Sequence, residues 1–249
     1  MDKLESKVAL ISGGGTGIGR ATAELFDSVG YKVHIFGRRE NPLLEVSSKS
    51  KNIIYHIGDI NQEKRIQEIV KDIISEENKI DILVNNAGIY IPGKLIDFEK
   101  DSMNQLFSTN IIGMLNLSKH VLIEMIKQKK GNIVNLASIL GVIGAEDTIV
   151  YTATKGAVIA ATRAMAIEYA KYGIRVNSIC PSVVESNMLN EVFNNDPEFK
   201  KRLLSAHPTK EFLTPKQVAK SILYLSSEES YPLNGHNLVL DGGRSVYDR

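Results

Sequence analysis

Short runs of apolar residues alternate along the chain with longer stretches in which apolar residues recur at helical spacing. The short runs are rich in Val and Ile and are apolar at consecutive positions, as expected of strands buried on both faces of a parallel sheet. The pattern predicts seven strands, at Val8–Ile11, Val33–Phe36, Ile53–Tyr55, Ile80–Val84, Ile133–Leu136, Ile174–Cys180 and Leu238–Leu240.

The longer stretches have the pattern of amphipathic helices. Between Gln62 and Ser75, apolar residues recur at i, i+3, i+4, i+7 and i+8 and so share one helix face. Alternating strands and helices predict an α/β fold with a single Rossmann-type, doubly wound parallel sheet and helices on both faces. Because no Pro-, Gly- or Ser-rich linker divides the 249 residues, we expect one domain over residues 1–249.

Residues 182–214 depart from this alternation. They are mostly polar and include Pro197 and Pro208. The segment directly follows a predicted strand, and open α/β sheets bind ligands at the carboxyl ends of their strands. We therefore expect a lid over a binding site, with a surface insertion as the alternative.

Charge and composition exclude several classes of function. Lys and Arg exceed Asp and Glu by one, and Trp is absent, which argues against nucleic-acid and anionic-membrane partners. The single cysteine, Cys180, excludes a disulfide framework and suggests a reducing compartment. We expect a cytoplasmic protein without a metal site, because no two of the five histidines have ligand spacing and His34 and His56 lie on predicted strands.

A glycine cluster follows the first predicted strand and opens a helix, which is how a backbone approaches a pyrophosphate at a helix N-terminus. The glycines have the spacing G-x-x-x-G-x-G rather than G-x-G-x-x-G. A flexible loop is the alternative, but the flanking strand and helix favour dinucleotide binding. The candidate phosphate-binding residues are Gly13, Gly15, Thr16, Gly17, Ile18 and Gly19.

The end of the second predicted strand indicates which dinucleotide is bound. An acidic residue there would hydrogen-bond a ribose 2′-hydroxyl, whereas arginine favours a 2′-phosphate. Gly37 occupies the acidic position and Arg38 and Arg39 follow it. We expect NADP(H), with NAD(H) possible if the arginines are only solvated and Glu40 takes the hydroxyl.

Tyr151 and Lys155 lie at i and i+4 in a predicted helix and so share one face. The same spacing at Tyr90 and Lys94 is interrupted by Pro92-Gly93, which excludes a helix there. Ser138 follows the carboxyl end of the predicted strand at Ile133–Leu136. Asn110 interrupts an apolar helix face, as either a satisfied core amide or a residue that faces a site.

Together these motifs, with Asn85-Asn86-Ala87-Gly88 and Pro181, resemble the short-chain dehydrogenase/reductase family over essentially the whole chain, including members similar to 3-oxoacyl-acyl-carrier-protein reductases. The resemblance implies that Asp59 and Ile60 contact adenine. It also places Asn85, Ala87 and Gly88 beside the adenosine, and Pro181, Val184 and Ser186 beside the nicotinamide. The family's usual Pro-Gly is Pro181-Ser182 here, so serine must adopt a conformation easy for glycine.

Carbonyl reduction requires a hydride on carbon and a proton on oxygen. A free phenol has a pKa near 10, and one positive charge ~4 Å away would lower it toward neutrality. We therefore expect Tyr151 to be the general acid/base, with its pKa lowered by Lys155, which also binds the nicotinamide ribose. Ser138 would hydrogen-bond the substrate oxygen, and Asn110 would hold a water that feeds Lys155.

The expected function is that of an NADP(H)-dependent oxidoreductase. Its expected substrate is a small carbonyl compound or alcohol, preferably a largely apolar ketone or 3-oxoacyl group. A dinucleotide-sensing protein without turnover is the alternative from another class, and a sugar epimerase is a third.

Lys127, Lys129 and Lys130 either complement a helix dipole or dock an acyl carrier protein. Surplus apolar residues on two helices predict an oligomer, and the family resemblance implies a homotetramer. An apolar pocket is expected from Ile89, Tyr90, Ile91, Ile139, Leu140, Val142, Met188 and Leu189.

Overall fold

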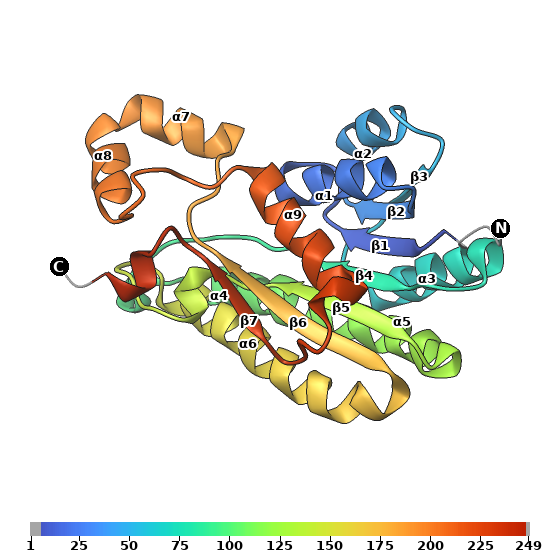
Figure 1. The fold of residues 1–249 in the computed structure, drawn as a ribbon. Helices are drawn as coiled ribbons and strands as arrows, with labels where there is room; N and C mark the ends of the chain where they lie inside the picture. The colour runs from blue at the N-terminus through green and yellow to red at the C-terminus, as the bar shows by residue number, and fades with distance from the viewer. Residues whose placement is uncertain (1–5, 248–249) are drawn as a thin grey trace.

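A computed structural model describes residues 6–247, apart from the side chains of Asn187, Met188, Asn190 and Val192; the expected pocket position of Met188 thus lies outside the described side chains. All strands of this part lie in one parallel sheet of order β3-β2-β1-β4-β5-β6-β7 (Figure 1). They are β1 (Val8–Ser12), β2 (Lys32–Gly37), β3 (Ile53–Ile57), β4 (Ile82–Asn85), β5 (Gly131–Leu136), β6 (Ile174–Pro181) and β7 (Asn237–Leu240).

Every predicted strand is present, although β4 begins two residues after Ile80. Helices fill the connections, and no helix within residues 6–247 combines the length and apolar character that crossing a bilayer requires. They are α1 (Gly17–Ser28), α2 (Glu40–Ser47), α3 (Glu63–Glu77), α4 (Lys100–Phe107), α5 (Met114–Gln128), α6 (Ile149–Tyr169), α7 (Asn187–Asn195), α8 (Pro197–Ser205) and α9 (Pro215–Ser226). Short 3-10 turns span Leu95–Asp97, Ile139–Gly141, Ala170–Tyr172, Glu228–Ser230 and Arg244–Val246.

The sheet separates two apolar cores because successive strand residues point to opposite faces. Val8 and Leu10 of β1 pack with residues of α3, α5 and α6. Ala9 and Ile11 of the same strand pack with residues of α1, α2 and α9. Figure 1 shows these two helix layers on opposite sides of the sheet, as the doubly wound prediction requires.

The strand order reverses between β1 and β4, so the chain leaves the sheet in opposite directions at that point. Ser12, at the end of β1, bridges the two strand ends: its Oγ accepts hydrogen bonds from the backbone N–H groups of Asn86 and Ala87, both at 3.0 Å. The Asn86 side chain donates back to the carbonyl oxygens of Ser12 and Gly13. These bonds fix the loops that open the crevice between β1 and β4.

Residues 182–214 form α7, α8 and their connections, which Figure 1 shows beyond the carboxyl end of β6 and away from the two helix layers. The two ends of the segment are joined where Val184 forms a β-bridge with Leu213. Phe193 of α7 is buried and stacks on Phe212 with ring centroids 5.2 Å apart. The segment thus has a small apolar cluster of its own, and its role as a lid stays a prediction.

Candidate active site

A cavity opens at the carboxyl ends of β1, β2, β3 and β4, beside the switch point. Residues from four separate loops meet there because parallel strands direct all their carboxyl ends to one edge. Of the residues expected from the sequence, the cavity is lined by Gly13, Gly15, Thr16, Arg38, Arg39, Asp59, Ile60, Ala87 and Gly88. It is also lined by Pro42, Leu43, Asn61 and Thr109, which sequence reasoning did not identify.

The glycine loop has the geometry of an anion cradle. Gly13 and Gly17 have φ angles of 68° and 55°, which residues with a Cβ rarely adopt. Gly17, Ile18 and Gly19 form the first turn of α1, and the preceding Thr16 makes no side-chain cap to that turn. The first N–H groups of α1 are therefore free of a side-chain acceptor, and no acidic residue lies in the turn, so the loop fits a pyrophosphate.

Arg38 and Arg39 are exposed at the cavity and make no ion pair with any residue in the 6–247 range. Glu40, the alternative ribose ligand, begins α2 and accepts a hydrogen bond from the Tyr55 hydroxyl at 3.2 Å. Glu40 is not among the residues that line the cavity. The cationic pair therefore fits an additional phosphate better than a plain ribose hydroxyl.

Asn85 differs from the expectation that it lines the adenosine. Its side chain is buried and donates to Ser118 Oγ at 2.9 Å and to Asn135 Oδ1 at 2.8 Å. The amide nitrogen therefore joins β4, β5 and α5 inside the core, whereas Oδ1 of Asn85 has no hydrogen-bond partner within the described residues. Only Ala87 and Gly88 of that motif reach the cavity.

Tyr151, Lys155 and Ser138 lie together at the carboxyl end of β5, and Lys155 is also near Gly88 of the cavity. The Ser138 hydroxyl is near enough to the Tyr151 phenol to lower its pKa, and it accepts a hydrogen bond from the backbone N–H of Leu140. The buried Lys155 ammonium donates to the carbonyl oxygen of Leu136 at 2.7 Å and lies 5.8 Å from the centroid of the Tyr151 ring.

The expected lowering of the Tyr151 pKa does not occur in this arrangement. Burial raises the pKa of Tyr151 to about 12, against a smaller lowering by its bond to Ser138. Burial also lowers the pKa of Lys155 to about 8. Both shifts favour the neutral form because each group has lost water, and the ammonium is directed to Leu136 rather than to the phenol oxygen.

Asn110 lies in a π-helical turn, Ser108–Gly113, between α4 and α5. Its Oδ1 accepts from the backbone N–H of Ile89 at 2.8 Å, and its Nδ2 donates to the Ile89 carbonyl and to Thr154 Oγ1. A Cβ added at Gly88 would lie 3.2 Å from Asn110 Oδ1 and 3.6 Å from Lys155 Nζ. Asn110 is thus a satisfied core amide and also a neighbour of the site.

The remaining expected residues follow β6. Pro181 ends this strand, the half-buried Val184 pairs with Leu213, and the exposed Ser186 accepts a hydrogen bond from the N–H of Leu189. None of the three lines the cavity at β1 to β4.

The conformation expected for Ser182 was wrong: Ser182 does not have a positive φ. Its hydroxyl instead hydrogen-bonds to Nε2 of His207 at 2.7 Å. This contact joins the end of β6 to the later part of the 182–214 segment, and no local spacing predicts it because His207 lies 25 positions after Ser182.

Tyr90, which the sequence places only among the residues of an expected apolar pocket, lies beside Tyr151. Its ring meets that of Tyr151 edge-on, with centroids 4.9 Å apart. The chain from Tyr90 to Lys94 is not helical, as Pro92-Gly93 predicts. Tyr90 therefore covers the phenol of Tyr151 and is not part of a second Tyr–Lys pair.

Comparison with known proteins identifies the family. A model of the short chain dehydrogenase family matches residues 7–197. The chain belongs to the short-chain dehydrogenases. Secoisolariciresinol dehydrogenase from Forsythia intermedia is 36% identical over 98% of this chain and 91% of its own length. A 3-oxoacyl-[acyl-carrier-protein] reductase from Thermotoga maritima is 34% identical over 97% of this chain and 98% of its own length.

Solved structures agree with this assignment. ElxO with NADP bound superposes with a TM-score of 0.92 at 33% identity, covering 97% of this chain and all of its own. NAD+-bound xylitol dehydrogenase also gives a TM-score of 0.92, at 26% identity and the same coverage. This short-chain dehydrogenase is therefore an oxidoreductase that acts on CH–OH or C=O groups, and its neighbours include structures with either dinucleotide.

The burial of Lys155 gives a test based on stability. Because its pKa is about 8 in the folded chain and ordinarily 10.5, the unfolded chain binds more protons between those values. The free energy of unfolding of the wild type, relative to that of Lys155→Met, should therefore increase by roughly 2 kcal/mol from pH 7.5 to pH 10. The same contribution is lost as the pH decreases through 8. Urea unfolding at each pH measures this difference. The exposed Lys64→Met is the control, and an equal pH dependence in both variants would contradict the shift.

Proposed function

We propose that this short-chain dehydrogenase is an NADP(H)-dependent oxidoreductase that acts on a largely apolar ketone or 3-oxoacyl group, within one domain that has residues 182–214 as its lid. The observation that carries the proposal is the single sheet edge at which two sets of residues meet. Arg38 and Arg39 line the dinucleotide cavity, and Ser138, Tyr151 and Lys155 lie together farther along the same edge.

Tyr151 is the proposed proton donor to the carbonyl oxygen. Burial keeps its phenol protonated near neutral pH, as a general acid requires, and the Ser138 hydroxyl orients it. When bound, the nicotinamide supplies the hydride. Because a phenolate forms when the proton leaves, the nearby Lys155 would stabilise that charge and could bind the ribose, while Asn110 would hold a water behind Lys155. Pro181, Val184 and Ser186 are the proposed contacts of the nicotinamide.

NADP(H) is the proposed cofactor because two unpaired guanidinium groups line the cavity while Glu40 is engaged by Tyr55. NAD(H) remains the alternative, because the structurally similar xylitol dehydrogenase has NAD+ bound. Gly13, Gly15, Thr16, Gly17, Ile18 and Gly19 are the proposed pyrophosphate contacts. Asp59 and Ile60 are the proposed contacts of the adenine.

Arg38→Ala should weaken NADPH binding by roughly 10- to 100-fold, because one charge-assisted hydrogen bond to phosphate contributes about 1.5–3 kcal/mol. NADH, which lacks the 2′-phosphate, should bind the variant as it binds the wild type. Fluorescence titration with each dinucleotide measures both constants. Lys51→Ala, which removes one exposed positive charge outside the cavity, is the control. Equal losses for NADPH and NADH would overturn the assignment of Arg38.

Tyr151→Phe should reduce kcat by about 10²- to 10⁴-fold, the usual contribution of a positioned proton donor, while the Kd for NADPH changes little. NADPH oxidation with ketones, quinones and oxoacyl thioesters identifies the substrate class first and then compares the variants. Tyr169→Phe removes a phenol from the same helix and should keep full activity. Normal turnover by Tyr151→Phe would show that another group moves the proton.

A dinucleotide-sensing protein without turnover is the competing proposal. It would bind NADPH through the same cavity and oxidise it with none of the tested carbonyl compounds. Ser138, Tyr151 and Lys155 argue against it, because binding alone requires no phenol and serine hydroxyl placed together beside a buried lysine. A sugar epimerase has no observation in its favour.

An acyl carrier protein is a weaker proposal for the substrate carrier. The Thermotoga relative is a reductase of that class, and Lys127, Lys129 and Lys130 end α5. However, Lys127 is paired with Glu124 at 2.8 Å and Lys130 with Glu228 at 3.4 Å. Lys127 and Lys130 therefore already have partners within the chain, and Lys127, in the last turn of α5, also complements the helix dipole.

A homotetramer is the proposed assembly, and the cytoplasm stays the predicted location. The proposal rests on large apolar side chains that are exposed on α4, α5, α6 and the turn between them, which are Phe107, Ile112, Leu115, Ile123, Ile149 and Ile167. Light scattering at micromolar concentration should give four times the 27.5 kDa chain mass. A monomeric mass would contradict the proposal.

A further inference from the structure

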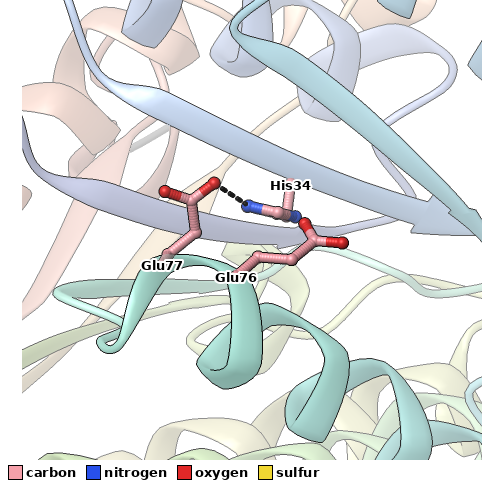
Figure 2. Close-up of side chains that lie close together, drawn as sticks. All are labelled: His34, Glu76 and Glu77. Carbon is pink, nitrogen blue, oxygen red and sulfur yellow. Dashed lines mark ion pairs between the residues drawn. The ribbon is translucent and has the colours of Figure 1, made fainter.

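A buried histidine meets two carboxylates at the end of the sheet opposite the dinucleotide cavity. His34, in β2, is fully buried, and Glu76 and Glu77 are the last two acidic residues of α3. Figure 2 shows both carboxylates turned toward the imidazole of His34. One ring nitrogen of His34 and one oxygen of each carboxylate all lie within 4.8 Å of one another.

The hydrogen bonds of His34 leave one nitrogen without a partner. Nδ1 lies 3.0 Å from Nε2 of His56, whose ring stacks on it. Nε2 is buried and has no hydrogen-bond partner, although it lies 3.5 Å from Oε1 of Glu77. A buried nitrogen without a partner costs free energy, so this geometry calls for an explanation.

The position of the two glutamates is also unfavourable without a cation. They lie in the last turn of α3, where the helix dipole is negative, and no basic residue lies in that turn. Glu76 makes no hydrogen bond or ion pair with any other residue between 6 and 247. Glu77 is paired with the ammonium of Lys32 at 3.3 Å and with Nε2 of His34 at 3.5 Å. The only cationic side chain paired with this group within residues 6–247 is therefore Lys32, which contacts Glu77.

We propose that Nε2 of His34 and the carboxylates of Glu76 and Glu77 bind one divalent transition-metal ion of the Zn²⁺ class. Imidazole and carboxylate are ligands that Zn²⁺ accepts at about 2.0–2.2 Å, with water in the fourth position. The exposed side chain of Glu76 can move by the small distance that closes the set. Two carboxylates neutralise the ion, and this positive charge relieves the helix end.

His56 is the proposed hydrogen-bond partner that orients the metal ligand His34. A histidine ligand commonly donates its other ring N–H to a neighbouring acceptor, which fixes its tautomer and orientation. Nδ1 of His34 faces Nε2 of His56 at hydrogen-bond distance, so the lone pair of His34 Nε2 is left for the metal. The bound ion would hold the end of α3 against β2. No local spacing predicts this site, because Glu76 lies 42 positions after His34.

The test uses the full chain with any purification tag removed, treated with EDTA and then titrated with Zn²⁺ against a chromophoric chelator. We expect one equivalent per chain and a higher melting temperature with Zn²⁺ than without it. Glu76→Gln and Glu77→Gln should each weaken binding at least 10-fold, and His34→Leu should abolish it. Glu68→Gln removes a carboxylate from the same helix and should bind like the wild type.

Co²⁺ provides a second readout that does not depend on folding of the His34 variant. Its visible absorption should be intense in the wild type, as in a four-coordinate site, and should change in Glu77→Gln. His56→Leu should weaken Zn²⁺ binding by about 10- to 100-fold. The proposal would be overturned if the wild type bound no Zn²⁺, or if Glu76→Gln and Glu77→Gln bound Zn²⁺ as tightly as the wild type does. In either case the three side chains would form only an ion-pair network.

Discussion

Burial of both faces of a parallel sheet is the constraint on which the rest of this molecule depends. Most strand positions are therefore apolar, and polar side chains buried within strands, such as His34 in β2 and Asn135 in β5, need partners there. All strands run the same way, and every carboxyl end therefore opens at one edge. The hydrogen bonds that the N–H groups of Asn86 and Ala87 donate to Ser12 Oγ fix the loops at this edge where the strand order reverses. The dinucleotide cavity and the Tyr151 cluster follow from it.

Burial at this edge of the sheet disfavours the charged forms of Tyr151 and Lys155. Both are taken out of water, and each is shifted toward its neutral form. The ammonium is satisfied by the Leu136 carbonyl and not by the phenol. The phenol of Tyr151 is therefore protonated near neutral pH, which is the state that the proposed proton donor requires. Burial, more than the lysine, sets the proton affinity of the tyrosine.

Local pattern was sufficient for the seven strands, for the helix that carries Tyr151 and Lys155, and for the cavity-lining loops. It was insufficient where a side chain's partner lies far along the chain. Asn85 belongs to a motif beside the cavity, yet its amide is used by Ser118 and Asn135 in the core. Ser182 was expected to adopt a conformation easy for glycine, but its φ is not positive and its hydroxyl hydrogen-bonds to His207. Both cases depend on distant residues.

The sequence by itself determined the order of elements, the sheet type and the chemical groups at each strand end, because strand and helix periods are local properties of the chain. Tertiary structure decided which of those groups share a site. It turned Glu40 toward Tyr55, placed Tyr90 over Tyr151, and brought His34 to Glu76 and Glu77. The physical reason is that a contact between distant residues depends on how whole elements pack, which no local spacing records.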